Sequence, residues 1–323
     1  MHVMTEQYLL DLQDVTVEYD YQGQHFAAVE DVSFGILKGE TLGLVGESGC
    51  GKSSIGKSII QLPPPTKGKI LFEGKQLSNL SNRALQRIRH NMQIIFQDPV
   101  ASLNPRRKVR NILSEPLIIS GVKEKKEIEE RVSFVLNAVS MNPDTTLDKR
   151  PHEFSGGQCQ RICIARALIL EPKFIVCDEP VSSLDVSIQA QILNLLEDLK
   201  RKHDLTLLFI SHDLAVVKNI SDRVAVMYLG KLCEIGASME IYEKPLHPYT
   251  HGLIGSVPSI VYENKKIRET ELIGEIPSLM NPPSGCRFRT RCSRSEEKCE
   301  NHEPDLREIR KGQFVACHFP LEY

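Results

Sequence analysis

The chain lacks three features that would place it in common classes of protein. Its 323 residues carry 40 Lys and Arg against 42 Asp and Glu, and the resulting net charge of −2 argues against a nucleic-acid-binding surface. No uninterrupted apolar stretch reaches the roughly 18 residues of a membrane-spanning helix, and residues 1–7 lack the apolar core of a signal peptide. Internal repeats and low-complexity segments are also absent from the sequence. We therefore expect a cytosolic protein, in which any contact with a membrane must come through partners.

The order of predicted elements indicates an α/β protein with two parts. Residues 8–71 alternate strands with a glycine-rich loop and a helix, residues 74–170 favour helices, and residues 174–232 return to alternating strands and helices. Beyond residue 257, prolines punctuate a polar tail with little periodicity. The sequence predicts a large domain, residues 1–256, and a separate C-terminal extension, residues 257–323.

A phosphate-binding loop is a full match to the pattern G-x-x-x-x-G-K-[ST], and it lies between the apolar run 41–45 and a helix predicted from Ser54. Its glycines let backbone N–H groups surround phosphate oxygens, and the helix N-terminus adds positive potential. Lys52 is expected to reach the β- and γ-phosphates of a nucleotide, and Ser53 to ligate Mg²⁺. The candidate residues are Gly46, Glu47, Ser48, Gly49, Cys50, Gly51, Lys52 and Ser53.

An acidic pair follows the apolar run 174–177, which reads as a buried strand. Such a strand delivers Asp178 and Glu179 to its C-terminal edge, where open α/β sheets bind ligands. We expect Asp178 to orient Mg²⁺ through its waters and Glu179 to polarise an attacking water as a general base. An acidic pair at a strand end is usually a solvated turn, but the phosphate loop upstream favours the catalytic interpretation.

A second phosphate-binding element is predicted at Ser155, Gly156, Gly157 and Gln158, which begin a helix predicted to extend to Leu170. The free N–H groups at its start can hold a γ-phosphate. Because the chain already has a complete phosphate loop, this second element is best explained if two subunits sandwich two ATP molecules head to tail, with the segment acting on the partner's nucleotide.

These three elements, in this order, resemble the ATP-binding cassette family. The resemblance implies a P-loop NTPase cassette with a RecA-like core, an antiparallel β subdomain and a helical subdomain, and it implies ATP and Mg²⁺ as ligands. Gln97 matches the glutamine that senses Mg²⁺ and the attacking water, and His212 matches the switch histidine at the γ-phosphate. Either residue alone would more often be structural.

Two further residues have roles that the resemblance implies and alternatives that remain open. Asp185 belongs to a segment similar to the loop that touches the partner's site, but it could also cap the helix that follows. Tyr19 aligns with the aromatic residue that stacks on adenine, although it could be an ordinary strand tyrosine.

Four of the nine cysteines are clustered in the extension, in the pattern C-x5-C-x6-C-x17-C. In a cytosolic chain this arrangement argues for a metal rather than disulfides, and the spacing is not that of a common zinc finger. The five other cysteines fall mostly in apolar runs and are expected to be small buried hydrophobes. The clustered residues are Cys286, Cys292, Cys299 and Cys317, and the scattered ones are Cys50, Cys159, Cys163, Cys177 and Cys233.

Residues 247–250, 282–292 and 317–320 resemble the C-terminal region of the ATPases that energise import of oligopeptides and dipeptides. This resemblance implies a [4Fe–4S] cluster on the four cysteines. Zinc and free thiols remain alternatives, as do His302 and His318 as ligands. Because the phosphate loop is predicted to lie in another domain, ATP binding is expected to survive loss of one of these cysteines.

The same resemblance implies the partners and the location. They are a second ABC ATPase subunit, identical or paralogous, two transmembrane permease subunits and an extracellular or periplasmic substrate-binding protein, with this chain peripheral on the cytoplasmic face of the cell membrane. Import of nickel or glutathione is the nearest alternative. A soluble cassette ATPase is less favoured because the chain has a single cassette with closely spaced motifs, and intact Gln97, Glu179 and His212 argue against a regulator without turnover.

Overall fold

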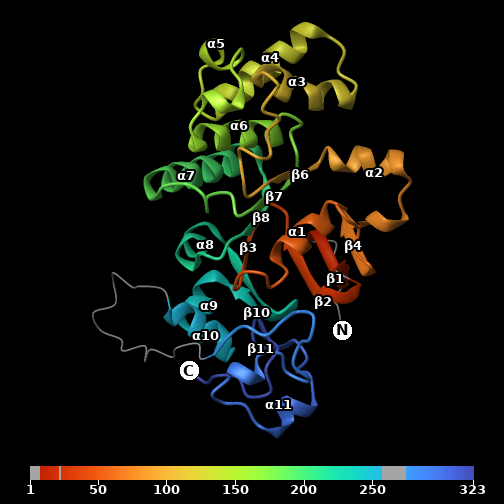
Figure 1. Cartoon of the computed structure of the whole chain (residues 1–323), viewed down its shortest axis with the longest axis vertical. Helices are drawn as coiled ribbons and strands as arrows, with labels where there is room; N and C mark the ends of the chain where they lie inside the picture. Colours follow the sequence, from red (N-terminus) through yellow and green to blue (C-terminus); the bar gives the residue numbers. More distant parts are fainter. Residues whose placement is uncertain (1–7, 22, 257–273) are drawn as a thin grey trace. The chain divides into compact units, whose positions relative to one another are not determined.

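The computed structural model describes residues 8–21, 23–256 and 274–323, and they form two compact units (Figure 1). Unit 1 comprises Met1–Ile36, Thr41–Ser78 and Ser211–Tyr323. Unit 2 comprises Leu37–Glu40 and Asn79–Ile210. The boundary predicted at residues 256 and 257 adjoins residues 257–273, which lie outside the described residues, so it stays a prediction.

Unit 1 contains an antiparallel sheet near the N-terminus, in the order β2-β1-β4-β5. Leu10 faces Phe72 across β1 and β4, and Leu12 faces Ile70; all four side chains are buried. Alternation of apolar and polar residues along β1 thus gives the sheet one core face. The strands are β1 (Tyr8–Tyr21), β2 (Gln24–Leu37), β4 (Lys67–Phe72) and β5 (Lys75–Gln76).

Unit 1 also contributes five neighbouring strands in the order β11-β12-β10-β9-β3. The pair β3 and β9 is parallel and the others are antiparallel. These strands are β3 (Thr41–Val45), β9 (Arg223–Tyr228), β10 (Lys231–Ala237), β11 (Arg307–Arg310) and β12 (Gln313–Val315). The helices of this unit are α1 (Lys52–Ile59), α8 (Leu214–Ile220), α9 (Ser238–Glu243), α10 (Pro248–Gly255), η3 (Arg289–Arg291) and α11 (Glu297–Asn301).

The C-terminal extension was predicted to be separate, but its described part continues the sheet of unit 1. Glu234 and Ile235 of β10 pair with Val315 and Phe314 of β12, and the Ala316 N–H donates to the Cys233 carbonyl at 2.8 Å. Figure 1 draws this part in blue beside β10. The sequence did not reveal the connection because β11 and β12 have only four and three residues, too few for a clear period-2 pattern.

Unit 2 has a parallel sheet in the order β8-β7-β6 and carries most of the helices. Every residue of β7 and β8 is buried, as the apolar runs in the sequence predict. Its strands are β6 (Met92–Ile95), β7 (Phe174–Asp178) and β8 (Thr206–Ile210). Its helices are α2 (Asn82–Arg89), α3 (Val109–Ser120), α4 (Lys125–Ala138), α5 (Pro143–Thr146), η2 (Pro151–Glu153), α6 (Gly156–Leu168) and α7 (Val186–His203), and η1 (Leu77–Asn79) joins the two units in sequence.

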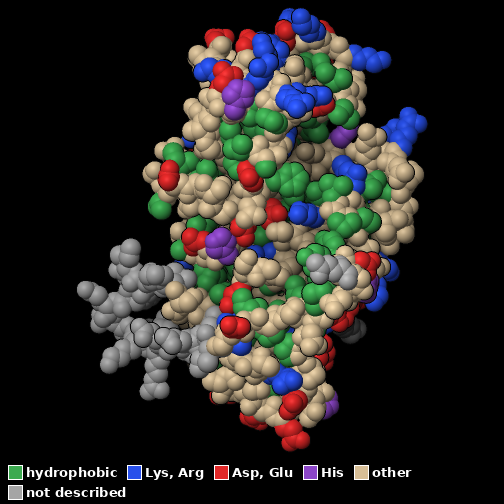
Figure 2. Space-filling model, viewed as in Figure 1, with side chains coloured by type: hydrophobic (Ala, Val, Ile, Leu, Met, Phe, Trp, Pro, Cys, Tyr) green, Lys and Arg blue, Asp and Glu red, His purple; other side chains and the backbone are tan. Residues whose placement is uncertain are grey.

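The helices of unit 2 are amphipathic. Val132 and Leu136 of α4 and Leu196 and Leu199 of α7 are buried, because residues at these spacings share one helix face. Figure 2 shows charged side chains of both signs gathered over the α3–α5 region, where i,i+4 pairs such as Lys125–Glu129 occur. None of the described helices has the length and apolar character needed to cross a membrane.

Candidate functional site

The phosphate loop joins β3 to α1 in unit 1, and its backbone requires glycine. Gly46 has φ 150° and Gly51 has φ 103°, in the left-handed region that side chains disfavour. A Cβ on Gly46 would overlap the Met227 carbonyl oxygen, and one on Gly51 would overlap the Ala28 carbonyl oxygen. The loop therefore forms a backbone cradle, and the main-chain carbonyls of Met227 and Ala28 pack closely against its two glycines.

Lys52 lies over this cradle and is only 4% exposed. Its ammonium donates to the carbonyl oxygens of Gly46 at 2.8 Å and Glu47 at 2.9 Å. Helix α1 begins at Lys52, two residues earlier than the sequence predicts, and its N-cap Gly51 makes no side-chain cap hydrogen bond. The loop thus brings together a helix N-terminus and a buried ammonium, two groups that bind phosphate.

The acidic pair lies at the C-terminal end of β7 in unit 2. Asp178 is the last residue of this strand and is 4% exposed. The Glu179 N–H donates to the Ile210 carbonyl at 3.0 Å, and Gln97 donates from Nε2 to the Glu179 carboxylate at 2.9 Å. Two of the three predicted catalytic residues therefore touch each other, with a carboxylate held where a strand ends.

The third predicted catalytic residue, His212, is exposed in unit 1 just before α8. Asp213 caps that helix by accepting from the N–H groups of Ala215 at 2.8 Å and Val216 at 3.2 Å. Asp213 itself donates from its N–H to Ser211 Oγ at 3.0 Å. These caps fix the backbone on both sides of His212 while its own side chain faces solvent.

The segment predicted to act on a partner's nucleotide caps α6. Ser155 is the N-cap residue, and a reciprocal capping box joins it to Gln158: Ser155 Oγ accepts from the Gln158 N–H at 3.4 Å, and Gln158 Oε1 accepts from the Ser155 N–H at 3.0 Å. Ser155, Gly156 and Gln158 are exposed, and Gly157 is partly so. The capping box within the segment orders the start of α6, and this start is exposed to solvent. An element that acts on another chain must be exposed in this way.

Asp185 and Tyr19 are the two residues for which the sequence allows a structural role as well as a role in the nucleotide site. Asp185 occupies the N-cap position of α7, but its side chain makes no cap hydrogen bond. The loop before it is instead held by Gln189, whose Nε2 donates to the carbonyls of Val181 at 3.0 Å and Leu184 at 2.9 Å. Tyr19 is half-buried on β1, with its ring 6.2 Å from that of Phe26, so a role in stacking on adenine stays a prediction.

The four clustered cysteines belong to a partly buried group in the extension. Burial raises the pKa of Cys286 to about 11, and burial together with its neighbours Cys286, Cys292 and Cys299 raises that of Cys317 to about 12. The Cys286 N–H donates to the Cys299 carbonyl at 2.8 Å, which closes the loop between them. Within the described part of the chain, no three His, Cys, Asp or Glu side chains converge as ligands of a single metal ion.

The remaining cysteines follow the sequence prediction. All five are buried, and none of them forms a disulfide. The alternative ligand His318 donates from Nε2 to the His302 carbonyl at 2.9 Å.

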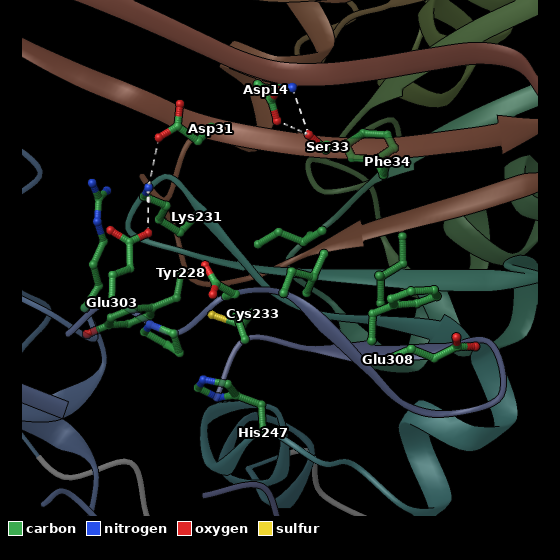
Figure 3. A pocket seen from close by; sticks show the side chains of 18 of the residues that line it. Asp14, Asp31, Ser33, Phe34, Tyr228, Lys231, Cys233, His247, Glu303 and Glu308 are labelled. Carbon is green, nitrogen blue, oxygen red and sulfur yellow. Dashed lines mark hydrogen bonds and ion pairs between the residues drawn. The ribbon is translucent and has the colours of Figure 1, made fainter. Parts of the chain in front are cut away.

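A cavity of about 1120 Å³ lies within unit 1, away from the phosphate loop. Figure 3 shows Lys231 between Asp31 and Glu303, at 3.5 and 2.7 Å, with Cys233 and His247 deeper in. Its lining combines the N-terminal sheet, β10 and the extension, and includes Cys286. Of the four clustered cysteines, Cys286 is the one that lines this cavity.

Sequence reasoning missed one contact of the site. Arg291 of the extension forms a two-point ion pair with Glu47 of the phosphate loop, across 244 positions in sequence. Only the position of Arg291, next to Cys292, hinted at any role. A pair so distant in sequence leaves no local pattern.

The comparisons with known proteins agree with this geometry. Residues 29–182 match the family described as ABC transporter, and residues 233–299 match the oligopeptide/dipeptide transporter C-terminal region. An oligopeptide transport ATP-binding protein of Bacillus subtilis is 48% identical, covering 98% of this chain and 99% of its own length. One of Haemophilus influenzae is 50% identical, covering 91% and 89%. A solved dimeric cassette bound to ADP and Pi has a TM-score of 0.65 at 27% identity, covering 71% of this chain and 98% of its own.

The fold and the site define an ATP-binding cassette, the ATPase module of ABC transporters. Within this class, the chain belongs to the family of oligopeptide and dipeptide transport ATP-binding proteins. The predicted cassette fold is confirmed.

Proposed function

We propose that this chain is the ATP-hydrolysing subunit of an ABC importer that energises uptake of oligopeptides or dipeptides. The observation that carries the proposal is a complete phosphate cradle with a buried lysine, together with Glu179 held by Gln97. The names of the relatives point to peptides rather than to nickel or glutathione. The C-terminal match points to the same substrates.

The chemistry assigned to each residue follows from its placement. Backbone N–H groups of the loop from Gly46 to Ser53, other than those of Glu47 and Cys50, bind the phosphates together with the Lys52 ammonium. Ser53, Asp178 and Gln97 are the residues that would hold Mg²⁺. The metal supplies charge neutralisation for the transferred phosphoryl group. Glu179 accepts a proton from the attacking water, and Gln97 orients that carboxylate through its hydrogen bond. His212 contacts the γ-phosphate.

The exposed start of α6 serves the nucleotide of a second cassette. Its N–H groups, with Ser155 and Gln158, complete a site whose phosphate loop lies on the partner chain, and Asp185 touches the same site. Two cassettes then work beneath two transmembrane permease subunits on the cytoplasmic face, supplied by a substrate-binding protein outside. The similarity of this chain to a dimeric cassette bound to ADP and Pi supports the pairing of two cassettes.

A second part of the proposal concerns the four clustered cysteines. Cys286, Cys292 and Cys299 all raise the pKa of Cys317, so the thiols are neighbours. Within the described residues, no three His, Cys, Asp or Glu side chains form a group that could hold a metal ion. The resemblance of the extension to that of the peptide-import ATPases implies all-thiolate ligation of a cluster. On that resemblance we propose that Cys286, Cys292, Cys299 and Cys317 hold a [4Fe–4S] cluster, with zinc as the alternative.

The proposed function is tested by uptake of labelled dipeptides and oligopeptides in cells that lack the gene and are complemented with wild type or with Lys52→Ala. Wild type should restore peptide uptake and the variant should not, because Lys52 binds the phosphates. Lys57→Ala on the same helix is the matched control and should restore uptake. Restored uptake of nickel or glutathione alone would overturn the assignment to peptides.

A further inference from the structure

The Glu47 side chain of the phosphate loop is held by the C-terminal extension. Arg291 donates from Nη1 to Glu47 Oε2 at 2.7 Å and from Nη2 to Glu47 Oε1 at 3.0 Å. The Arg291 side chain is 5% exposed and that of Glu47 is 19% exposed. A two-point, charge-assisted pair shielded from water is stronger and more directional than a surface ion pair.

Aromatic side chains fix this pair from behind. The Arg291 guanidinium lies 5.7 Å from the centre of the Tyr228 ring, which packs against Tyr249 at 4.7 Å and Phe288 at 5.3 Å. The Tyr249 hydroxyl accepts from the Glu47 N–H at 2.9 Å. Both the backbone and the carboxylate of Glu47 are thus fixed by residues beyond position 228.

Glu47 passes this constraint to the phosphate-binding lysine. The Glu47 carbonyl oxygen accepts from Lys52 Nζ at 2.9 Å and from the Cys50 N–H at 3.3 Å. A change in how the Glu47 side chain is held therefore acts on the residue whose carbonyl positions the Lys52 ammonium.

A second arginine of the extension reaches the same loop through a turn. Arg287 donates to the Leu229 carbonyl and pairs with the Glu30 carboxylate. The next residue in that turn, Gly230, donates from its N–H to the Cys50 carbonyl at 2.9 Å. Arg287 directly follows Cys286, and Arg291 directly precedes Cys292. Cys292 is thus one residue away from a direct contact to the phosphate loop. Cys286 is one residue away from Arg287, whose link to the loop passes through Leu229 and Gly230.

We infer that the extension is part of the nucleotide site. Arg291 is a positioning residue that fixes the conformation of the phosphate loop through Glu47. The degree of order in the four-cysteine segment therefore affects the affinity of the loop for nucleotide. The inference rests on the proposed binding of ATP at this loop. It replaces the expectation that ATP binding is independent of the extension, because the loop and the extension share unit 1 and touch through Glu47.

The first experiment measures the Kd for Mg-ADP by calorimetry on the full chain. Arg291→Gln should raise Kd about tenfold and Arg291→Lys about threefold, because lysine keeps the charge but loses the two-point geometry. The KM for ATP should rise with Kd while kcat at saturation stays within about twofold, since Arg291 does not touch the reacting atoms. If Arg291→Gln folds poorly, the Kd of Arg291→Lys still tests the inference.

The control is Arg289→Gln, which removes a guanidinium bonded to Ser284 and Glu300 inside the extension. It should leave Kd within about twofold of wild type. In a Glu47→Gln background, Arg291→Gln should add less than about twofold, because its partner is already lost. Unchanged Kd in both Arg291 variants, or an equal effect of Arg291→Gln without Glu47, would overturn the inference. Failure of wild type to bind Mg-ADP would instead overturn the proposed function.

The second experiment asks whether the cysteine group acts through Arg291. Cys292→Ser should raise Kd about threefold in wild type but add less than about twofold in Arg291→Gln. The iron content of the same samples shows whether the substitution removed iron from the four cysteines. Loss of iron with unchanged Kd would overturn the link between the cysteines and the loop.

Discussion

The phosphate loop and the four-cysteine extension lie in the same unit but are specified differently. The loop is encoded in eight consecutive residues. Its backbone conformation is restricted because Gly46 and Gly51 have positive φ values and pack closely against main-chain atoms. The described part of the extension, residues 274–323, has short strands and few buried apolar residues. It is joined to the rest of the unit by separated pairs such as Arg287–Glu30 and Arg291–Glu47. Local sterics can be recognised in a sequence, whereas pairwise contacts cannot.

The largest expected effect separates nucleotide binding from hydrolysis. Glu179→Gln should lower kcat at least about a hundredfold, because an amide cannot accept the proton of the attacking water. Mg-ADP affinity should stay within about twofold, since the cradle is untouched. The measurements are phosphate release and calorimetry, with Glu171→Gln, an exposed position in the same unit, as the control. Near wild-type turnover in Glu179→Gln would assign the base elsewhere.

The second prediction tests whether loop sterics dominate. Gly51→Ala should weaken Mg-ADP binding at least about tenfold, because alanine at φ 103° is strained and its Cβ would overlap the Ala28 carbonyl. Gly74→Ala is the matched control: it also has positive φ, 73°, but open space around its Cβ, so it should bind normally. Equal affinity of the two variants would show that the cradle tolerates a side chain.

The sequence predicted those elements of the fold and the site that depend on local patterns. The phosphate loop, the buried strand before Asp178 and the capping segment at Ser155 were all recognisable, because each is a local pattern with a local physical cause. Gln97 was predicted as a site residue only through the family resemblance, and its contact with Glu179, 82 positions away, was not predicted. The continuation of the sheet by β12 and the Arg291–Glu47 pair were not predictable, because neither has a periodicity or a motif of its own.

The third prediction concerns the extension alone. Anaerobically purified protein should be brown and carry about four irons per chain, and Cys286→Ser should lose both. Cys233→Ala is the sharper control, because Cys233 is buried and is not one of the four proposed ligands, although burial, and after it the charge of Cys286, raises its pKa. Its variant should stay brown. Colourless protein with one zinc would keep the metal site and remove the cluster, and loss of colour in Cys233→Ala would enlarge the ligand set.

The smallest expected effect lies where the extension packs against the cassette. His247 caps α10 by accepting from the Tyr249 N–H at 3.0 Å, and its ring lies 5.8 Å from that of Phe288. Burial lowers the pKa of His247 to about 4, so the unfolded chain binds more protons than the folded one between that value and its usual pKa near 6.5. Stability from this residue is therefore present above pH about 6.5 and is lost as pH falls toward 4.

His247→Asn should remove this pH dependence, because asparagine can still cap the helix but does not titrate. Between pH 7 and 5.5, wild type should lose about 1 kcal/mol more free energy of unfolding than the variant, measured by denaturant titration. Comparing the two proteins also cancels the buried Glu234 carboxyl, whose pKa is raised by burial and which contributes in the opposite direction as pH falls. Identical slopes in the two proteins would show that His247 is not held neutral where the extension meets the cassette.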